Sequence, residues 1–398
     1  MKKGINNMLL FLCVSMIPLC SCTQKIALDK LIEEQMALAI EQYSRMAESI
    51  KEEKLLLPRT IDAEGKVKMV KSNDWTSGFY PGVLWYLYEY SNDEQWKNLA
   101  MDATARLEKE QYNTQTHDLG FMLYCSYGNG FRLTHDSNYA TIMLRGANSL
   151  CTRYNPVVGL IRSWDHGSWQ YPVIIDNMMN LEYLCWASTY SGDTSFYHTA
   201  VVHANNTLRH HFRSDNSSYH VVDFNPITGD VISKGTHQGY DDESAWARGQ
   251  AWGFYGYTMM YRETKKEEYL QQAIKIADFI IHHPNLPADK VPYWDYNDPK
   301  IPDAPRDASA AAIFCSGLIE LSGYVGAEQK KNYLNIAEQI LRSLSSENYC
   351  AKAGENGNFI LKHSVGSKPH NNEVDVPLNY ADYYYIEAML RMNALLHE

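Results

Sequence analysis

The sequence predicts an all-α protein whose helices form six hairpins closed into a ring, an (α/α)6 barrel. Most long segments after Ile26 carry apolar residues at helical spacing, and the helices they predict pair naturally. Hydrophobic residues make up 45% of the 398-residue chain and charged residues 21%, which is ordinary for a globular protein. This composition excludes a disordered chain and a multi-pass membrane protein. No linker divides the chain, so we expect a single domain over residues 23–398.

The helical periodicity gives twelve expected elements. They cover residues 27–56, 77–91, 93–110, 117–130, 136–154, 174–191, 193–213, 242–262, 266–283, 305–323, 328–346 and 379–396. Five of the turns between them share one pattern, in which an acidic or polar stretch precedes an aromatic residue that opens the next helix: Trp96, Tyr139, Tyr197, Tyr269 and Tyr333. The spacing of these turns is too uneven for a short solenoid repeat and fits one hairpin per unit with loops of variable length.

The second helix of each predicted pair begins with polar residues. These starts are residues 74–78, 117–118, 176–177, 241–244, 306–307 and 379–382. In an (α/α)6 barrel the inner helices converge on a central cavity, and their amino-terminal ends carry unpaired N–H groups and partial positive charge. Helix capping alone could explain any one of these starts. Six such polar starts at equivalent positions, flanked by Trp and His, indicate a functional site at this end of the barrel.

The first twenty-two residues predict a lipoprotein signal peptide. A basic start precedes an apolar run that is too short for a permanent membrane helix, and the run ends in Leu-Cys-Ser-Cys. This ending resembles a bacterial lipobox in which Cys22 receives the lipid; the alternative is a plain secretory signal. Because Thr23 follows Cys22 where inner-membrane lipoproteins commonly have Asp, we expect a periplasmic protein anchored to the outer membrane.

Charge and motifs narrow the classes of partner. Lys and Arg total 36 against 47 Asp and Glu, a net charge of -11, which disfavours binding to nucleic acid or to an anionic membrane surface. Membrane contact is therefore expected only through the lipid anchor. The cysteines after Cys22 are far apart and lack zinc-site spacing, and no P-loop, GxSxG or paired-His metal signature occurs. We expect no disulfide framework, no metal and no cofactor.

Two aspartates stand out as candidates for chemistry. Asp118 lies in THDLGF at the start of an apolar helix, and Asp176 lies in VIIDNMMN among Val, Ile and Met. Desolvation raises the pKa of a carboxyl group, and a neighbouring carboxylate raises it further. One protonated and one ionised aspartate form an acid/base pair suited to sugar chemistry.

Five stretches in order resemble a known family. They are DWTSGFYPG at 74–82, THDLGF at 116–121, VIIDNMMNLEYL at 173–184, THQGYDDESAWARGQAWGFYGY at 236–257, and the segment from His363 that reads HSVGSKPHNNEVDVPLNYADYYYIEA. From about Ser72 to the carboxyl terminus the chain resembles the unsaturated glucuronyl hydrolases of glycoside hydrolase family 88. The resemblance implies an enzyme that needs no metal or organic cofactor.

The resemblance implies roles for individual residues. Asp176 would be the general acid/base, and Asp118 the second essential carboxylate, which holds Asp176 protonated and places the sugar. Arg248 would pair with the substrate carboxylate or position groups around it. The other implied substrate contacts are Trp75, His117, Trp164, His220, Gln238, Trp252, Ser364 and Ser367. From the residues alone, Trp252 could equally be core, His220 could be a loop residue, and the role of Trp164 could belong to the neighbouring Trp169.

The chemistry implied is hydration of a double bond. Polysaccharide lyases leave a C4=C5 double bond in the terminal uronic acid of their products. Asp176 would protonate C4, and water deprotonated by the same carboxylate would add at C5. The resulting hemiketal opens and releases the next sugar. The expected substrates are unsaturated oligosaccharides derived from chondroitin, hyaluronan or heparin, and Lys368, next to Ser367, is a candidate contact for sulfate.

Three other functions remain open at this stage. An unsaturated rhamnogalacturonyl hydrolase would share the barrel and the chemistry but act on pectin fragments. A sugar 2-epimerase would favour His rather than Asp as the acid/base group. A lipid-anchored glycan-binding protein would keep the barrel without catalysis, and an Asp176→Asn variant would retain its function.

Overall fold

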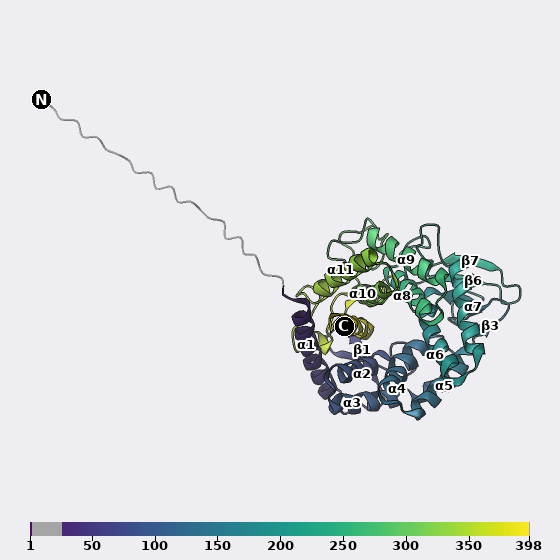
Figure 1. Ribbon diagram of the computed structural model, residues 1–398, viewed down its shortest axis with the longest axis horizontal. Coiled ribbons are helices and arrows are strands. Elements are labelled where there is room, and N and C mark those ends of the chain that lie inside the picture. The colour runs from purple at the N-terminus through teal and green to yellow at the C-terminus, as the bar shows by residue number, and fades with distance from the viewer. Residues whose placement is uncertain (2–25, 398) are drawn as a thin grey trace.

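The computed structural model describes Met1 and residues 26–397, and within them the helices form two concentric rings (Figure 1). The outer ring comprises α1 (Leu28–Ser49), α3 (Glu94–Ala105), α5 (Ser137–Cys151), α7 (Thr194–His210), α9 (Glu267–His282) and α11 (Ala327–Leu344). The inner ring comprises α2 (Phe79–Ser91), α4 (Asn129–Thr134), α6 (Leu181–Ser191), α8 (Ala247–Thr264), α10 (Ala308–Leu321) and α12 (Asn379–His397). Outer and inner helices alternate along the chain, as the predicted (α/α)6 barrel requires.

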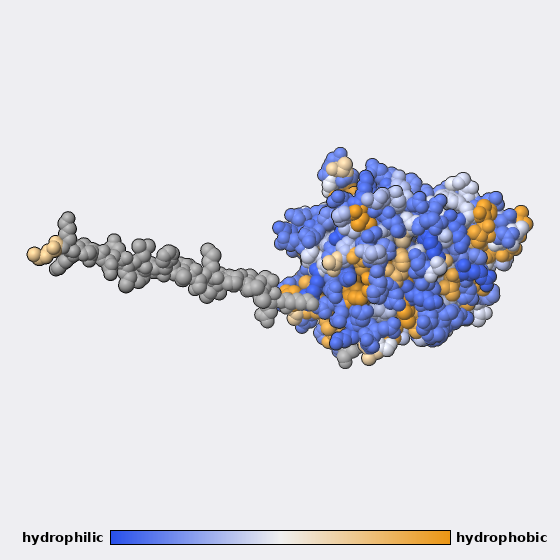
Figure 2. All heavy atoms as spheres, turned by 90° about the horizontal axis from the view of Figure 1, so that it is seen from above, coloured by the Kyte–Doolittle hydropathy of each residue, from blue (hydrophilic) through white to orange (hydrophobic). Residues whose placement is uncertain are grey.

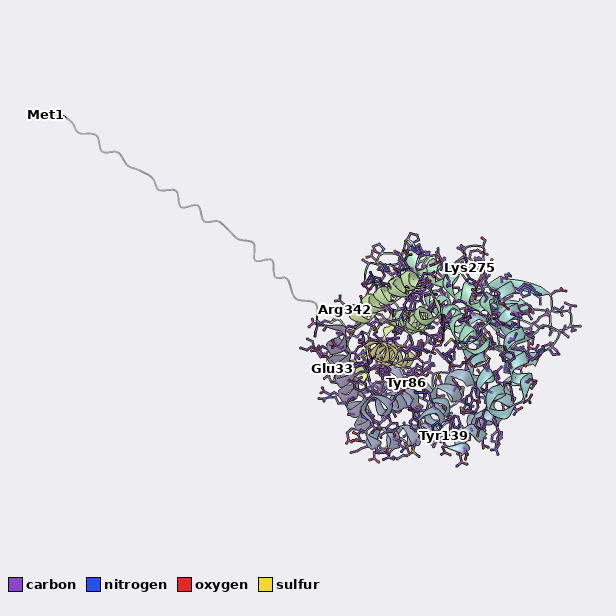
Figure 3. The ribbon with its side chains drawn as sticks, in the orientation of Figure 1. Met1, Glu33, Tyr86, Tyr139, Lys275 and Arg342 are labelled. Atoms are coloured by element: carbon purple, nitrogen blue, oxygen red, sulfur yellow. The ribbon has the colours of Figure 1, made fainter. Side chains whose placement is uncertain are left out.

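The inner ring is closed by contacts between the two ends of the fold. Neighbouring inner segments contact one another around the ring, α6 through the helical segment at residues 120–128 that precedes α4, and α12 packs against both α10 and α2. The labelled side chains in Figure 3 illustrate the layers, because Tyr86 of α2 lies toward the centre while Glu33, Tyr139, Lys275 and Arg342 lie on outer helices.

The two rings differ in residue pattern because they differ in burial. In α11 the buried residues recur every three or four positions, at Tyr333, Ile336, Ala337, Ile340, Leu341 and Leu344, so one stripe faces the core. In α10, by contrast, thirteen of the fourteen residues are buried. A helix that is apolar on all sides is stable in water only when neighbours surround it, and this requirement places α10 in the inner ring.

The recurring turn pattern has a capping origin. Asp93, Asp136 and Asp193 accept the backbone N–H two residues later and so cap α3, α5 and α7. The aromatic residue that follows anchors the first turn of the outer helix. In α7 the buried aromatic is Phe196, whereas Tyr197, which the sequence pattern selected, is only partly buried.

Several predicted helices are shorter or less regular than expected. The first ends at Ser49 rather than residue 56. The expected helix 117–130 is a π-helix, η2 (Gly120–Gly128), that continues into α4. The expected helix 174–191 begins as the end of strand β5 and a 3-10 turn, η3 (Ile175–Asn180), before α6. Periodicity could not show the last two of these differences, because Gly120 and Ile175 donate hydrogen bonds to Asn180 and His220, which are distant in the sequence.

Short antiparallel strands occupy the long loops. They pair as β1 (Leu57–Ile61) with β2 (Val67–Val70), β3 (Tyr154–Asn155) with β4 (Leu160–Ile161), β5 (Pro172–Ile174) with β6 (Val221–Phe224) and β7 (Val231–Gly235), and β8 (Ser364–Ser367) with β9 (Asn372–Val376). Strand β5 leads directly into η3, and the backbone N–H of Ala308, which opens α10, donates to the His363 carbonyl just before β8. The strands therefore lie at the end of the barrel where the inner helices begin.

The described surface is largely hydrophilic, with hydrophobic residues in small groups on the face seen in Figure 2. No helix among the described residues is long and apolar enough to cross a membrane. The predicted lipidation residue, Cys22, lies outside the described residues. Cys125, Cys151, Cys185, Cys315 and Cys350 are all unpaired thiols, as expected from their spacing.

Candidate active site at the amino-terminal ends of the inner helices

The inner helices bring one polar or aromatic side chain each to the same end of the barrel: Trp75 before α2, Asp118 before η2, Asp176 in η3, Arg248 in α8, Asp307 before α10 and Tyr380 in α12. Measured contacts connect them. The rings of Trp75 and Tyr380 have centroids 4.9 Å apart, and the Arg248 guanidinium lies 5.4 Å from the Tyr380 ring centroid. The charges of Arg248 and Asp118 both act on Asp176.

A glycine allows the first two inner helices to meet beside Trp75. A Cβ atom at Gly78 would lie 2.1 Å from the carbonyl oxygen of Phe121. Because no side chain fits in this space, the start of α2 packs backbone to backbone against η2. The edge of the Trp75 ring thereby reaches Phe121, with centroids 5.4 Å apart.

Asp176 is a buried acid with an unused oxygen. Its residue surface is 7% exposed, and its Oδ2 has no hydrogen-bond partner among the described residues. Burial raises the pKa of Asp176 to about 7, the nearby Arg248 opposes this rise, and the charge of Asp118 adds to it. A carboxyl group with such a pKa is partly protonated near neutral pH, in agreement with the expectation from its apolar neighbours.

Asp118 is held by its own loop and is more accessible than Asp176. Its Oδ2 accepts a hydrogen bond of 2.6 Å from the Thr116 hydroxyl, and 16% of its side-chain surface is exposed. Nε2 of His117 lies 3.2 Å from Asp118 Oδ1. Burial lowers the pKa of His117, partly offset by the charge of Asp118, so the imidazole is neutral near pH 7.

Helix capping accounts for some of the acidic starts but not for the two candidate catalytic residues. Asp307 accepts the Ser309 N–H and so caps α10, while Asp74 accepts the Thr76 N–H in the turn before α2. No side-chain cap is formed at the start of η2 or η3, where Asp118 and Asp176 lie. These two carboxylates are therefore available for another purpose.

His220 presents one defined nitrogen toward Asp176. Its Nδ1 accepts the backbone N–H groups of His237 and Gln238, at 3.0 and 3.2 Å. Burial keeps its pKa well below the usual range, so the ring is neutral and its proton must sit on Nε2. That Nε2 lies 3.8 Å from Asp176 Oδ2 and has no hydrogen-bond partner within residues 26–397.

The two terminal nitrogens of Arg248 bind the protein itself, whereas its Nε has no hydrogen-bond partner among the described residues. Its guanidinium donates to the carbonyls of Val365 and Gly366 in β8 and lies 3.2 Å from Asp307 Oδ2. Its side chain is 1% exposed. Of the two roles that the resemblance implies, these contacts favour the positioning of β8 over a direct pairing with the substrate carboxylate.

The three predicted tryptophans differ in burial, and so in whether their rings can contact a substrate. Trp252 is fully buried between Phe121 and Tyr384, with centroid distances of 5.0 and 5.3 Å, and therefore forms a wall. Trp75 is partly buried. Trp164 is partly buried at the mouth, where its ring stacks on His166 and meets the edge of His220.

The predicted polar contacts on β8 lie beside Arg248. The Ser364 hydroxyl is buried and has no partner in the described part of the chain. The Ser367 hydroxyl lies 2.7 Å from His370 Nδ1, and Gln238 Nε2 donates to the Gly366 carbonyl. Lys368 follows directly and is partly buried.

Several residues at this end had no role predicted from the sequence. Tyr380 lies between Trp75 and Arg248 with a buried hydroxyl that has no partner among the described atoms. His237 packs against Trp164, Trp169 and His370. The polar start at 379–382 signalled Tyr380, but no local pattern could place His237 and His370 together, because they lie on separate loops.

A raised pKa alone does not identify the site. Burial also raises the pKa of Asp382 to about 7. Its carboxylate, however, accepts the N–H groups of Ile360 and Leu361 and the Tyr43 hydroxyl, so it fastens a loop and α1 to α12. Asp176 differs because one of its oxygens is unpaired and because a second carboxylate lies nearby.

The arrangement can donate and accept a proton beside a group of aromatic rings. Among the described residues, no group of three or more His, Cys, Asp or Glu side chains could hold a metal ion. The unpaired groups Asp176 Oδ2, His220 Nε2 and Ser364 Oγ are hydrogen-bonding atoms suited to a hydroxylated ring.

Comparison with known proteins agrees with this chemistry. Residues 52–395 match the family described as Glycosyl Hydrolase Family 88. The chain is 50% identical over 343 residues, 85% of each chain, to an unsaturated glucuronyl hydrolase of Formosa agariphila. It is 33% identical over 367 residues, 90% of each chain, to an unsaturated chondroitin disaccharide hydrolase of Streptococcus pyogenes. A crystal structure of an unsaturated glucuronyl hydrolase specific for heparin superposes with a TM-score of 0.90 and 48% identity, covering 93% of this chain and 99% of that one.

Proposed function

The chain belongs to glycosyl hydrolase family 88, and from this membership we propose that it removes the terminal unsaturated uronic acid from glycosaminoglycan fragments made by lyases. Relatives named as unsaturated glucuronyl hydrolases or unsaturated chondroitin disaccharide hydrolases cover at least four-fifths of the chain. These names favour this activity over a pectin-fragment hydrolase, a 2-epimerase or a glycan-binding protein without catalysis.

The observation that carries the proposal is the state of Asp176. Burial raises its pKa to about 7, and its Oδ2 is unpaired in the described structure. A single group can act first as an acid and then as a base only when its pKa lies near the working pH. Hydration of a double bond by one residue requires this property.

The proposed reaction proceeds in three balanced steps. Protonated Asp176 transfers its proton to C4 of the unsaturated uronate, and the C4=C5 electron pair forms the new C–H bond. Positive charge then develops on C5 and O5, and water adds at C5 while Asp176 takes the proton that the water loses. The resulting hemiketal opens to a C5 ketone, and the hemiacetal left at C1 collapses to an aldehyde and releases the next sugar.

The neighbours of Asp176 support these steps. The accessible carboxylate of Asp118 would stabilise the developing positive charge and raise the pKa of Asp176. The His220 Nε2–H would donate to a hydroxyl or ring oxygen of the substrate beside Asp176. Arg248 would hold β8 so that the Ser364 hydroxyl faces the uronate carboxylate.

The aromatic groups would hold the sugar rings. Trp75 and Trp164 would stack on the substrate, while Trp252 would close the pocket. His117 and Gln238 would line it, and Ser367 and Lys368 would meet the second sugar. These roles are assigned according to how exposed each side chain is.

The test uses mature protein and unsaturated disaccharides prepared with chondroitin and heparin lyases. Loss of the ultraviolet absorbance of the conjugated double bond, with release of the free amino sugar, is the expected result. An Asp176→Asn variant should lose about 100-fold or more of this rate, the scale of general acid/base catalysis. No loss of absorbance on any of these disaccharides would contradict the proposal, and activity on unsaturated pectin fragments instead would support the pectin alternative.

The relatives also suggest an order of substrates. The heparin-specific enzyme shares 48% of aligned residues with this chain, whereas the streptococcal chondroitin disaccharide hydrolase shares 33%. We therefore expect heparin-derived disaccharides to be the better substrates. A higher kcat/KM on chondroitin-derived disaccharides would reverse this order without affecting the reaction type.

We propose further that the protein is anchored in the outer membrane through lipid on Cys22, facing the periplasm. The support is the Leu-Cys-Ser-Cys sequence and the Thr23 that follows. Expression in a Gram-negative host with labelled fatty acid should label the wild-type protein and not a Cys22→Ala variant. Equal release of both proteins into the soluble periplasmic fraction would contradict the anchor.

A further inference from the structure

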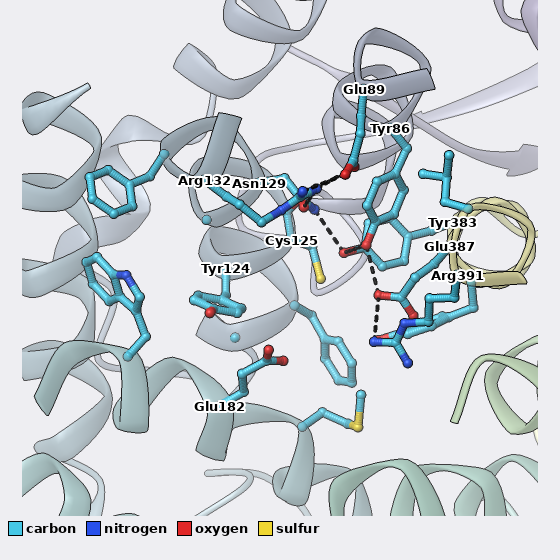
Figure 4. Close-up of a pocket in the computed structure, with 18 of the residues that line it drawn as sticks. Tyr86, Glu89, Tyr124, Cys125, Asn129, Arg132, Glu182, Tyr383, Glu387 and Arg391 are labelled. Carbon is cyan, nitrogen blue, oxygen red and sulfur yellow. Dashed lines mark hydrogen bonds and ion pairs between the residues drawn. The ribbon is translucent and has the colours of Figure 1, made fainter. Parts of the chain in front are cut away.

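A second cavity of about 620 Å³ lies inside the barrel, toward the carboxyl-terminal ends of the inner helices (Figure 4). Its lining comes from α2, η2, α4, α6, α8 and α12. Phe121 and Tyr384 line it and also pack against Trp252, at centroid distances of 5.0 and 5.3 Å. These three rings separate the second cavity from the site of Asp118 and Asp176.

One wall of the second cavity is aromatic. Trp186 lies within 6.4 Å of Tyr124 and 5.7 Å of Phe131, measured between ring centroids. Its ring also stacks on the exposed Tyr190, with centroids 5.2 Å apart and planes 15° apart. Ring faces of this kind attract both the C–H face of a sugar and a cation.

The charged side chains that line the cavity are three carboxylates and three guanidinium groups: Glu89, Glu182, Glu387, Arg132, Arg262 and Arg391. Arg262 and Arg391 are paired with Glu182 and Glu387 of the lining and also with Glu263 and Glu320, which lie behind it. The pair of Glu89 and Arg132 at the rim is neutral by itself. The two carboxylates behind the lining give this region an excess of negative charge, which favours a cationic ligand.

Two of the lining carboxylates differ in how their oxygens are used. Glu387 accepts hydrogen bonds from the hydroxyls of Tyr86, Tyr255 and Ser316, so both of its oxygens are occupied. Glu182 has one oxygen paired with Arg262, and the other has no partner among the described residues. A quarter of the Glu182 side-chain surface is accessible, and Figure 4 shows its carboxylate beside Tyr124, across the cavity from Tyr86, Glu387 and Arg391.

We propose that the second cavity binds a protonated amino sugar, with its ammonium group on the unpaired oxygen of Glu182 and its ring on Tyr124 and Trp186. The volume suits such a ligand together with several waters, since ligand pockets commonly span about 300–1,000 Å³. Burial raises the pKa of Glu182 to about 7 although the charge of Arg262 opposes this rise, so a second cation bound beside it would further favour the carboxylate form. This site is separate from the proposed hydrolysis and does not depend on it.

The test is a titration of the mature protein with glucosamine at pH 7, with glucose as the uncharged control, followed by ligand-observed NMR. Saturable binding of glucosamine and at least tenfold weaker binding of glucose are expected. Glu182→Gln should weaken glucosamine binding about tenfold or more, because an ammonium–carboxylate hydrogen bond is lost. Glu263→Gln is the matched control, since Glu263 also pairs with Arg262 but does not line the cavity.

Two further variants keep the result decisive. Trp186→Leu should weaken glucosamine binding through the lost ring face even if Glu182→Gln folds poorly. Asp176→Asn should leave the binding unchanged, because it lies beyond Trp252. Equal binding of glucose and glucosamine, the absence of saturation, or loss of binding in Asp176→Asn but not in Glu182→Gln would each overturn the proposal. None of these outcomes bears on the loss of absorbance that tests the hydrolase activity.

Discussion

His220 faces Asp176 with its Nε2 3.8 Å from the carboxyl Oδ2, while its Nδ1 is occupied by two backbone N–H groups. The backbone at His237 and Gln238 thus selects the tautomer of a residue in a different strand-loop segment. His220 Nε2 and Asp176 Oδ2 therefore both lack a hydrogen-bond partner among the described residues, and a ligand can supply one to each.

Replacement of His220 should therefore impair catalysis. We expect His220→Phe to lower kcat/KM about 10- to 100-fold, because a substrate oxygen loses a buried donor worth about 1.5–3 kcal/mol. The variant should also be less stable, because the N–H groups of His237 and Gln238 lose their acceptor. Kinetics on an unsaturated disaccharide would measure the effect. His282→Phe on the exposed end of α9 is the control, and equal losses in both variants would argue against a role of His220 at the site.

The pH profile should report the acid form of Asp176. Burial raises its pKa to about 7, and only the protonated carboxyl can donate to C4. We expect kcat/KM to fall about tenfold for each pH unit above about 7. A rate measured from pH 5 to 9 that stays constant above pH 7 would contradict Asp176 as the acid.

The same shift affects stability, with a sign that can be checked. Because the folded pKa of Asp176 lies above the ordinary value of about 4, the folded state binds more protons than the unfolded state between about pH 4 and 7. The contribution of Asp176 to stability is present at low pH and is lost as the pH rises through about 7. At pH 8, therefore, Asp176→Asn should melt at a higher temperature than the wild-type protein, and a lower Tm would show that its carboxylate is well satisfied.

For Asp382 we expect the opposite effect of an Asn substitution on stability. Its carboxylate accepts three hydrogen bonds, and an amide would place an N–H group against those donors. We expect Asp382→Asn to lower the free energy of unfolding by about 1–3 kcal/mol while kcat per folded molecule stays near the wild-type value. Urea unfolding together with kinetics would separate this effect from that of Asp176→Asn, and a selective loss of kcat would place Asp382 in the catalytic machinery instead.

Arg248 should act through the geometry of β8. A lysine cannot reach the carbonyls of Val365 and Gly366 and the Asp307 carboxylate together, because it lacks the planar fork of arginine. We expect Arg248→Lys to raise KM more than it lowers kcat, and to do so on every substrate. An unchanged KM with a reduced kcat would indicate a direct part in the chemical step.

Replacing Lys368 would test whether this residue contacts sulfate. Its partly buried side chain follows Ser367 on the segment that Arg248 fixes. Lys368→Ala should reduce kcat/KM on sulfated disaccharides about tenfold and leave unsulfated ones nearly unchanged, since a lysine–sulfate pair is a charge-assisted hydrogen bond. Equal losses on both kinds of substrate would remove sulfate as its partner.

Much of the site was predictable because it is encoded locally. Asp118 and Asp176 each follow a short motif at the start of an inner helix, and the apolar neighbours of Asp176 already implied a raised pKa. The resemblance already implied that Trp252 either stacks on the sugar or walls the site, but which of the two, the tautomer of His220 and the occupied terminal nitrogens of Arg248 were not predictable. Each depends on atoms from loops or helices that are distant in the sequence.

The sequence by itself determined the helical periodicity and the polar starts of the inner helices, because these follow from residue spacing. Only the tertiary structure decided which polar groups stay unpaired, because a hydrogen bond depends on where a distant partner lies. Hydrogen-bond partners distinguish Asp176 from Asp382, although both are buried and both have a raised pKa. The tertiary structure also leaves one oxygen of Glu182 without a partner among the described residues, in a second cavity that no sequence motif predicted.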